Sequence, residues 1–126
     1  MKTMQTTLRH RTMRIAAALA GLTFASAAFA HVFPQKQEPG AGASVTAPAQ
    51  VKVSFDGPLE PAFSSLSVTD ASGKTVTTQK SSVDAQQPAV MSVPLPTLAA
   101  GHYTVHWVAV ASDGHRTHGD YGFDVK

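Results

Sequence analysis

The chain has 126 residues, a length that fits a single domain. With 43% hydrophobic and 14% charged residues it can bury a core, which excludes a disordered polyelectrolyte. It contains 0 cysteines, which excludes disulfides, thiolate metal sites and cysteine nucleophiles.

The net charge of +2 is unevenly distributed. Four of the ten basic residues lie within the first 14 positions, whereas every acidic residue lies at Glu38 or later. From His31 to Lys126, six basic and eight acidic residues give a formal charge of −2. A basic nucleic-acid-binding surface is therefore not expected.

The first 30 residues have the pattern of a cleavable secretory signal peptide. Residues 2–14 are basic, residues 15–24 are apolar, and residues 28–30 (Ala-Phe-Ala) form a small-x-small cleavage site. The alternative is a membrane anchor, but the apolar stretch of residues 15–30 is somewhat short against the roughly 20 residues that a spanning helix needs. We therefore expect an exported domain, residues 31–126, that begins with His31.

Short alternating runs rich in β-branched and aromatic residues predict an all-β domain. The first strand is expected near residues 32–37, and the loop of residues 34–48 is expected to be an ordered surface connection. Further strands are expected at residues 51–55, 66–69, 74–78, 89–93, 101–111 and 121–125. About seven such strands are typical of an immunoglobulin-like, Greek-key β-sandwich or a small barrel. Trp107, on the longest strand, is the expected core anchor.

The strongest functional signal combines the new N-terminus with the loop Ser112-Asp113-Gly114-His115. An N-terminal His31 offers both its α-amine and a ring nitrogen as metal ligands. Asp113 and His115 project to the same side if the backbone is extended. This nitrogen and oxygen set favours Cu(II), with zinc as the second choice. Alone, Asp113-Gly114 would indicate only a turn.

The order of several segments resembles the CopC family of periplasmic copper-binding proteins. His31 matches the family's N-terminal histidine, and residues 38–42 (Glu-Pro-Gly-Ala-Gly) resemble its early turn. Residues 47–55 are similar to its first long strand, and residues 98–107, followed by Ser112-Asp113-Gly114-His115 and Gly119, resemble its most recognisable block. The resemblance implies a periplasmic β-sandwich that binds Cu(II) through His31, Asp113 and His115.

Two features depart from the pattern of some relatives. Met91 is the only methionine after residue 30 and has the position of an ordinary strand residue, so a thioether Cu(I) site is not expected. His118 follows His115 by three positions and faces away from it in an extended chain. We interpret His118 as an exposed residue or one that supports a ligand, with membership of the metal site as the alternative.

His102 and His106 fall on the strand face opposite Tyr103, Val105 and Trp107. Four residues apart in a strand, they are about 13 Å apart and cannot share one metal ion. An exposed polar sheet face is the expected interpretation.

The predicted function is copper resistance, buffering or delivery by a non-enzymatic carrier. The expected partners are a copper ion and an inner-membrane copper transporter or another copper carrier, and the domain is expected to be a monomer. Two alternatives remain: a copper-dependent oxidative enzyme resembling a polysaccharide monooxygenase, and a metal-free β-sandwich interaction module.

Overall fold

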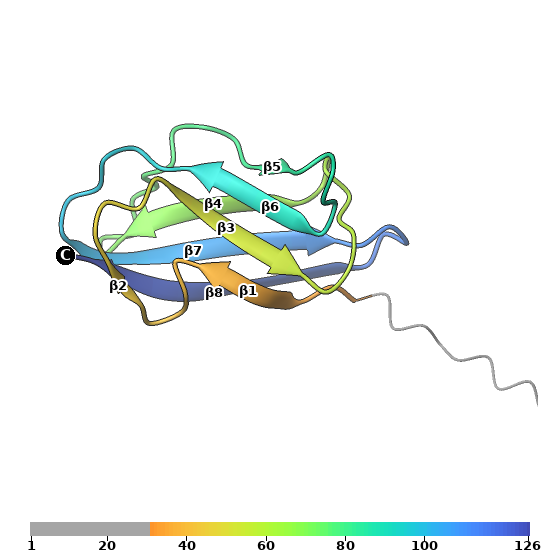
Figure 1. The fold of residues 1–126 in the computed structure, drawn as a ribbon, viewed down its shortest axis with the longest axis horizontal. Helices are drawn as coiled ribbons and strands as arrows, with labels where there is room; N and C mark the ends of the chain where they lie inside the picture. Colours follow the sequence, from red (N-terminus) through yellow and green to blue (C-terminus); the bar gives the residue numbers. More distant parts are fainter. Residues whose placement is uncertain (1–30) are drawn as a thin grey trace, which may run out of the picture.

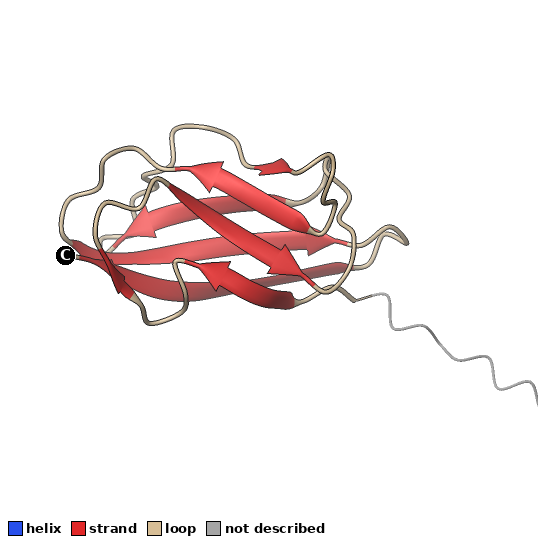
Figure 2. Ribbon diagram, in the orientation of Figure 1, coloured by secondary structure: helices blue, strands red, loops and turns tan. Residues whose placement is uncertain are grey.

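The computed structural model describes residues 31–126; the expected signal peptide, residues 1–30, lies outside the described residues. Within that range the chain forms strands and loops and no helix (Figure 2). The strands are β1 (Pro34–Glu38), β2 (Ser44–Val45), β3 (Gln50–Phe55), β4 (Ser65–Asp70), β5 (Ser82–Val83), β6 (Val90–Pro94), β7 (Gly101–Val110) and β8 (Arg116–Val125). No segment of residues 31–126 is a helix of membrane-spanning length and apolarity.

The strands form two four-stranded sheets that pack as two layers (Figure 1). Their orders are β1-β3-β6-β5 and β2-β8-β7-β4. Neighbouring strands are antiparallel except for the short β2, which runs parallel to β8. The predicted all-β sandwich is confirmed.

The core lies between the sheets and follows the alternation of the sequence. The buried side chains of β7 are the predicted ones, together with the strand's last residue: Tyr103, Val105, Trp107, Ala109 and Val110. Trp107 packs edge to face against Phe55 of the opposite sheet, with ring centroids 5.6 Å apart. A Cβ at Gly119 would lie 2.6 Å from the Trp107 ring, so only glycine fits beside that ring. Trp107 is thus the core anchor that was expected.

One buried polar group stands out in this core. The Tyr121 hydroxyl is buried and has no hydrogen-bond partner among the described residues. Burial raises the pKa of Tyr121 to about 12, so the phenol stays neutral near pH 7.

The expected strand at residues 74–78 is wrong. An isolated bridge pairs Thr69 with Thr75, and two backbone hydrogen bonds join Asp70 to Lys74 and Val68 to Val76, but no regular strand forms there. Instead, the Ser81 hydroxyl accepts a hydrogen bond from the Leu66 N–H at 2.9 Å, which covers part of the β4 edge. Side-chain hydroxyls compete with a regular ladder in this way.

Other strand boundaries also differ from expectation. β1 begins at Pro34, and both β1 and β2 lie within residues 34–48, where a connection was expected. β8 begins at Arg116, five residues before the predicted start. The prediction missed the first half of this strand because that half lacks the apolar alternation that indicates a strand. β2 and β5 have two residues each, too few to form a pattern.

Candidate metal centre

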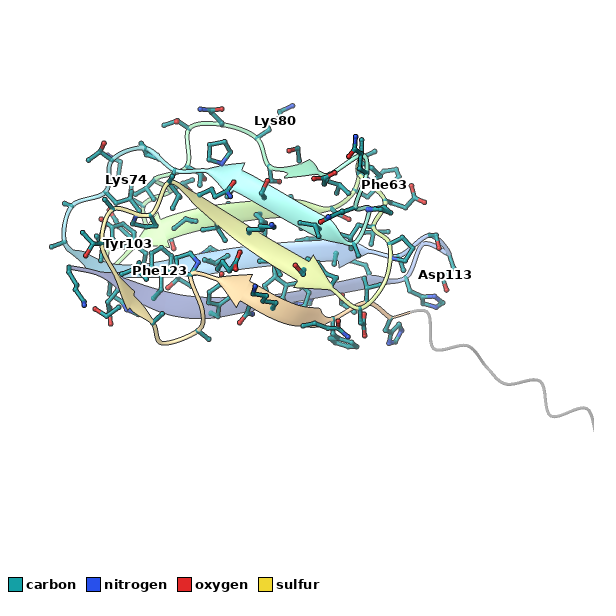
Figure 3. The ribbon with its side chains drawn as sticks, viewed as in Figure 1. Phe63, Lys74, Lys80, Tyr103, Asp113 and Phe123 are labelled. Atoms are coloured by element: carbon teal, nitrogen blue, oxygen red, sulfur yellow. The ribbon has the colours of Figure 1, made fainter. Side chains whose placement is uncertain are left out.

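The turn between β7 and β8 carries Asp113 and His115 and lies at the end of the sandwich opposite the C-terminus (Figures 1 and 3). The turn is closed by two backbone hydrogen bonds: the Ala111 N–H donates to the His115 carbonyl and the Gly114 N–H to the Ala111 carbonyl, both at 2.9 Å. Gly114 has φ of 89°, a left-handed conformation that favours glycine. The sequence Asp113-Gly114 therefore does form a turn, and that turn presents the two candidate ligands.

Asp113 makes two contacts with His115. Its Oδ1 accepts a hydrogen bond from the His115 N–H at 3.0 Å, and its Oδ2 lies 2.6 Å from His115 Nδ1. Two hydrogen bonds from His115 hold the pKa of Asp113 below its usual range. The bond from the backbone N–H has the larger effect, and the bond from the side chain has the next largest. Asp113 is therefore an anion near neutral pH. It orients the His115 ring and leaves Nε2 of that ring available to a metal.

His31 lies three residues before the start of β1, at the same end of the sandwich. Its ring centroid is 5.2 Å from that of His115, with the ring planes at 66°. Two histidines far apart in the sequence thus have neighbouring imidazoles, and the His115 side chain is 61% exposed. An ion from solvent can reach this pair directly.

The residues after His31 fix its position. Val32 is buried in the core, and its carbonyl accepts a hydrogen bond from Thr117 Oγ1 at 2.6 Å. The Phe33 N–H donates to Asp56 Oδ1 at 2.8 Å, and the Asp56 N–H donates to the Phe33 carbonyl at 3.0 Å. Sequence reasoning missed Asp56 and Thr117. In the sequence, Asp56 is followed by Gly57 and Pro58 and indicates only a turn, and a single threonine at position 117 gives no signal.

The described contacts join His31 to His115 and His115 to Asp113. Within residues 31–126 no three His, Asp or Glu side chains already stand as a complete metal-binding group. Both oxygens of Asp113 contact His115, and each carboxylate oxygen keeps a second lone pair for a metal ion. A cavity of about 210 Å³ lies beside His31 and is lined by His31, Val32, Asp56, Gly57, Pro58, Ala111 and Ser112.

His118 and Met91 lie apart from these residues. His118 lies on β8, paired with Val108 of β7, and its side chain is on the exposed face of the sheet. The side chain of its neighbour Thr117 is on the other face, where it contacts the N-terminal segment. Met91 is fully buried, which confirms its interpretation as an ordinary strand residue.

His102 and His106 occupy the outer face of β7, as expected. Each pairs across to β8: His102 Nδ1 lies 2.8 Å from Asp124 Oδ1, and His106 Nδ1 lies 2.7 Å from Asp120 Oδ1. The second ring nitrogen of His106 lies 2.8 Å from Thr69 Oγ1 on β4. These carboxylate partners depend on strand register and were not foreseen.

Comparison with known proteins gives consistent matches. The CopC domain model matches residues 35–126. Copper resistance protein C of Escherichia coli is 31% identical over 109 residues, covering 81% of this chain and 86% of that protein. The copper transport protein CutJ of Bacillus subtilis is 33% identical over 99 residues, covering 77% of this chain but only 18% of CutJ. The crystal structure of CopC from Methylosinus trichosporium OB3b has a TM-score of 0.72 and 38% identity, covering 76% of this chain and 94% of that one.

The fold and these matches define a class, the β-sandwich proteins of copper resistance and copper transport. Within that class the chain belongs to the CopC family. This family consists of copper-binding resistance proteins and not of enzymes, so the oxidative-enzyme alternative loses its support.

Proposed function

We propose that this protein is a periplasmic carrier that holds Cu(II) through His31, Asp113 and His115. The observation that supports the proposal most directly is the approach of the His31 and His115 rings to 5.2 Å. Neither histidine lies on a strand, and the two segments that carry them meet only through the fold.

The ligand chemistry suits Cu(II). If the signal peptide is cleaved before His31, the α-amine and one ring nitrogen of His31 form a chelate. The His115 ring adds a third nitrogen and Asp113 adds an anionic oxygen, which completes a tetragonal nitrogen and oxygen set. The remaining lone pairs of the Asp113 carboxylate allow it to bind the metal while it continues to orient His115.

The site's exposure favours exchange of copper with another protein. His115 is 61% and Asp113 37% exposed, at a turn that projects from one end of the sandwich (Figure 3). CutJ, a copper transport protein, contains a region similar to this chain within a much longer sequence. These observations support transfer of copper between this domain and a membrane transporter, in addition to buffering.

The test compares two mature proteins, one that begins at His31 and one with a single glycine before it. The added residue converts the α-amine of His31 into a peptide amide, which holds its proton far more strongly. Cu(II) affinity, measured against a competing chelator, should fall at least about tenfold, or about 1.4 kcal/mol. Electron paramagnetic resonance should show fewer nitrogen ligands in the extended protein. Equal affinities would remove the amine from the site.

A further inference from the structure

The segment His31-Val32-Phe33 is held by contacts that involve no proposed metal ligand. Val32 is 5% exposed and belongs to the hydrophobic core. A Cβ at Gly57 would lie 3.0 Å from Val32 Cγ1, which shows how closely the chain surrounds this side chain. The buried valine therefore places the α-carbon of the preceding His31 within a narrow range.

Thr117 provides a second restraint, from the strand that His115 leads into. Its Oγ1 donates to the Val32 carbonyl at 2.6 Å and lies 3.4 Å from the Ala109 carbonyl. Thr117 is two residues beyond His115, and Val32 is one residue beyond His31. One hydroxyl thus connects the two segments whose imidazoles are neighbours.

We propose that Thr117 is a positioning residue for copper binding: by holding the Val32 carbonyl, it sets the His31 ligands against His115 before the metal arrives. The inference rests on the proposed copper site. A free N-terminal residue would lose conformational entropy on binding, and a residue already held in place loses less of it. Residues that orient metal ligands typically contribute about 10–100-fold to metal affinity. Because Asp56 also restrains this segment, we expect the lower end of that range for Thr117.

The test uses Thr117→Val in the mature protein that begins at His31, since valine keeps the shape and removes the hydroxyl. Thr104→Val is the matched control, because Thr104 lies on the neighbouring strand β7 with its side chain on the other face of the sheet. Thr117→Val should weaken Cu(II) binding about tenfold and Thr104→Val less than about twofold. Thr117→Ser, which retains the hydroxyl, should bind within about twofold of the parent protein.

A second background separates positioning from a general structural effect. In a protein that carries His31→Ala and one added glycine before residue 31, the change Thr117→Val should alter Cu(II) affinity less than about twofold, because both ligands that Thr117 positions, the ring and the free α-amine, are absent. An equal loss in both backgrounds would overturn the inference. If Thr117→Val does not fold, Thr117→Ser and Thr117→Ala, which differ chiefly in the hydroxyl, ask the same question.

The outcomes distinguish the two proposals. If His31→Ala alone binds Cu(II) like the parent, the proposed copper site is wrong, and the positioning role fails with it. If His31→Ala weakens binding while Thr117→Val behaves like Thr104→Val, only the positioning role is overturned.

Discussion

Two regions of the molecule contain His–Asp pairs with nearly the same nitrogen-to-oxygen distance but different surroundings. In the turn after β7, His115 Nδ1 lies 2.6 Å from Asp113 Oδ2. On the outer face of β7 and β8, the corresponding nitrogen-to-oxygen distances are 2.8 Å for His102 and 2.7 Å for His106. The short pair distance therefore does not distinguish a candidate metal site from a sheet surface.

The surroundings of each imidazole make the difference. His115 has the His31 ring as its neighbour, brought there by a separate segment of the chain. On the sheet, the second nitrogen of His106 contacts Thr69, and the ring of His102 lies over Gly122, where a Cβ would come within 2.7 Å of it. A regular strand also keeps residues four apart at about 13 Å. His31 and His115 come together because two separate non-strand segments meet at one end of the sandwich, an arrangement that a sheet face does not provide.

The largest expected effect is on copper binding at the turn. His115→Ala should weaken Cu(II) binding about 100-fold, or about 2.8 kcal/mol, because it removes a proposed nitrogen ligand. His102→Ala, on the sheet, should change the affinity less than about twofold. Titration of both variants against a competing chelator tests the comparison, and similar losses from the two would contradict it.

Asp113→Asn should have the next largest effect, a loss of about tenfold in Cu(II) affinity. The amide keeps the size of the side chain but removes the negative charge that, in the proposed site, binds the metal and orients His115. Asp120→Asn makes the same change beside His106 and should leave the affinity unaltered. Electron paramagnetic resonance of the two copper-loaded variants is a second readout, since only Asp113→Asn should change the spectrum.

His106→Ala should reverse the pattern and affect stability without affecting copper. It removes the contacts with Asp120 and Thr69 that join three neighbouring strands. We expect the free energy of unfolding to fall by about 1 kcal/mol, as for the loss of a partly buried hydrogen bond. Urea denaturation measures this change, and an unchanged midpoint would show that the pair is only a surface contact.

Asp124→Asn should have the smallest effect. The side chains of His102 and Asp124 are each 55% exposed, and exposed ion pairs contribute little because water screens them. The free energy of unfolding should change by less than about 0.5 kcal/mol in the same urea assay. A loss as large as that from His106→Ala would mean that the contact with Thr69 does not set the His106 pair apart from the His102 pair.

Much of the fold was predictable because alternation determines which strand face is buried. The β3 and β7 runs gave nearly correct strands, and Tyr103, Val105 and Trp107 were assigned to the core. The strand expected at residues 74–78 did not form a regular ladder, because along the β4 edge the Leu66 and Val68 N–H groups donate to the Ser81 and Thr77 hydroxyls. Alternation cannot report such competition.

The candidate site was predictable only in part. The sequence indicated His31, Asp113 and His115 from the expected cleavage and from a family resemblance, and the fold brings the two histidine rings together. Their use as copper ligands stays a prediction. Neither Asp56 nor Thr117 could be linked to His31, because contacts between the N-terminal segment, β3 and β8 depend on tertiary packing.

The environment of Trp107 makes the intrinsic fluorescence of this protein a direct measure of whether the two sheets remain packed. The chain has 1 tryptophan, so its fluorescence comes from a single known position. That indole is 7% exposed and packs between Phe55 and the bare backbone of Gly119. Its emission therefore originates in an apolar environment and shifts to longer wavelength when the two layers separate. A spectrum that keeps its native wavelength in a variant with weak copper binding shows that the sandwich has remained closed.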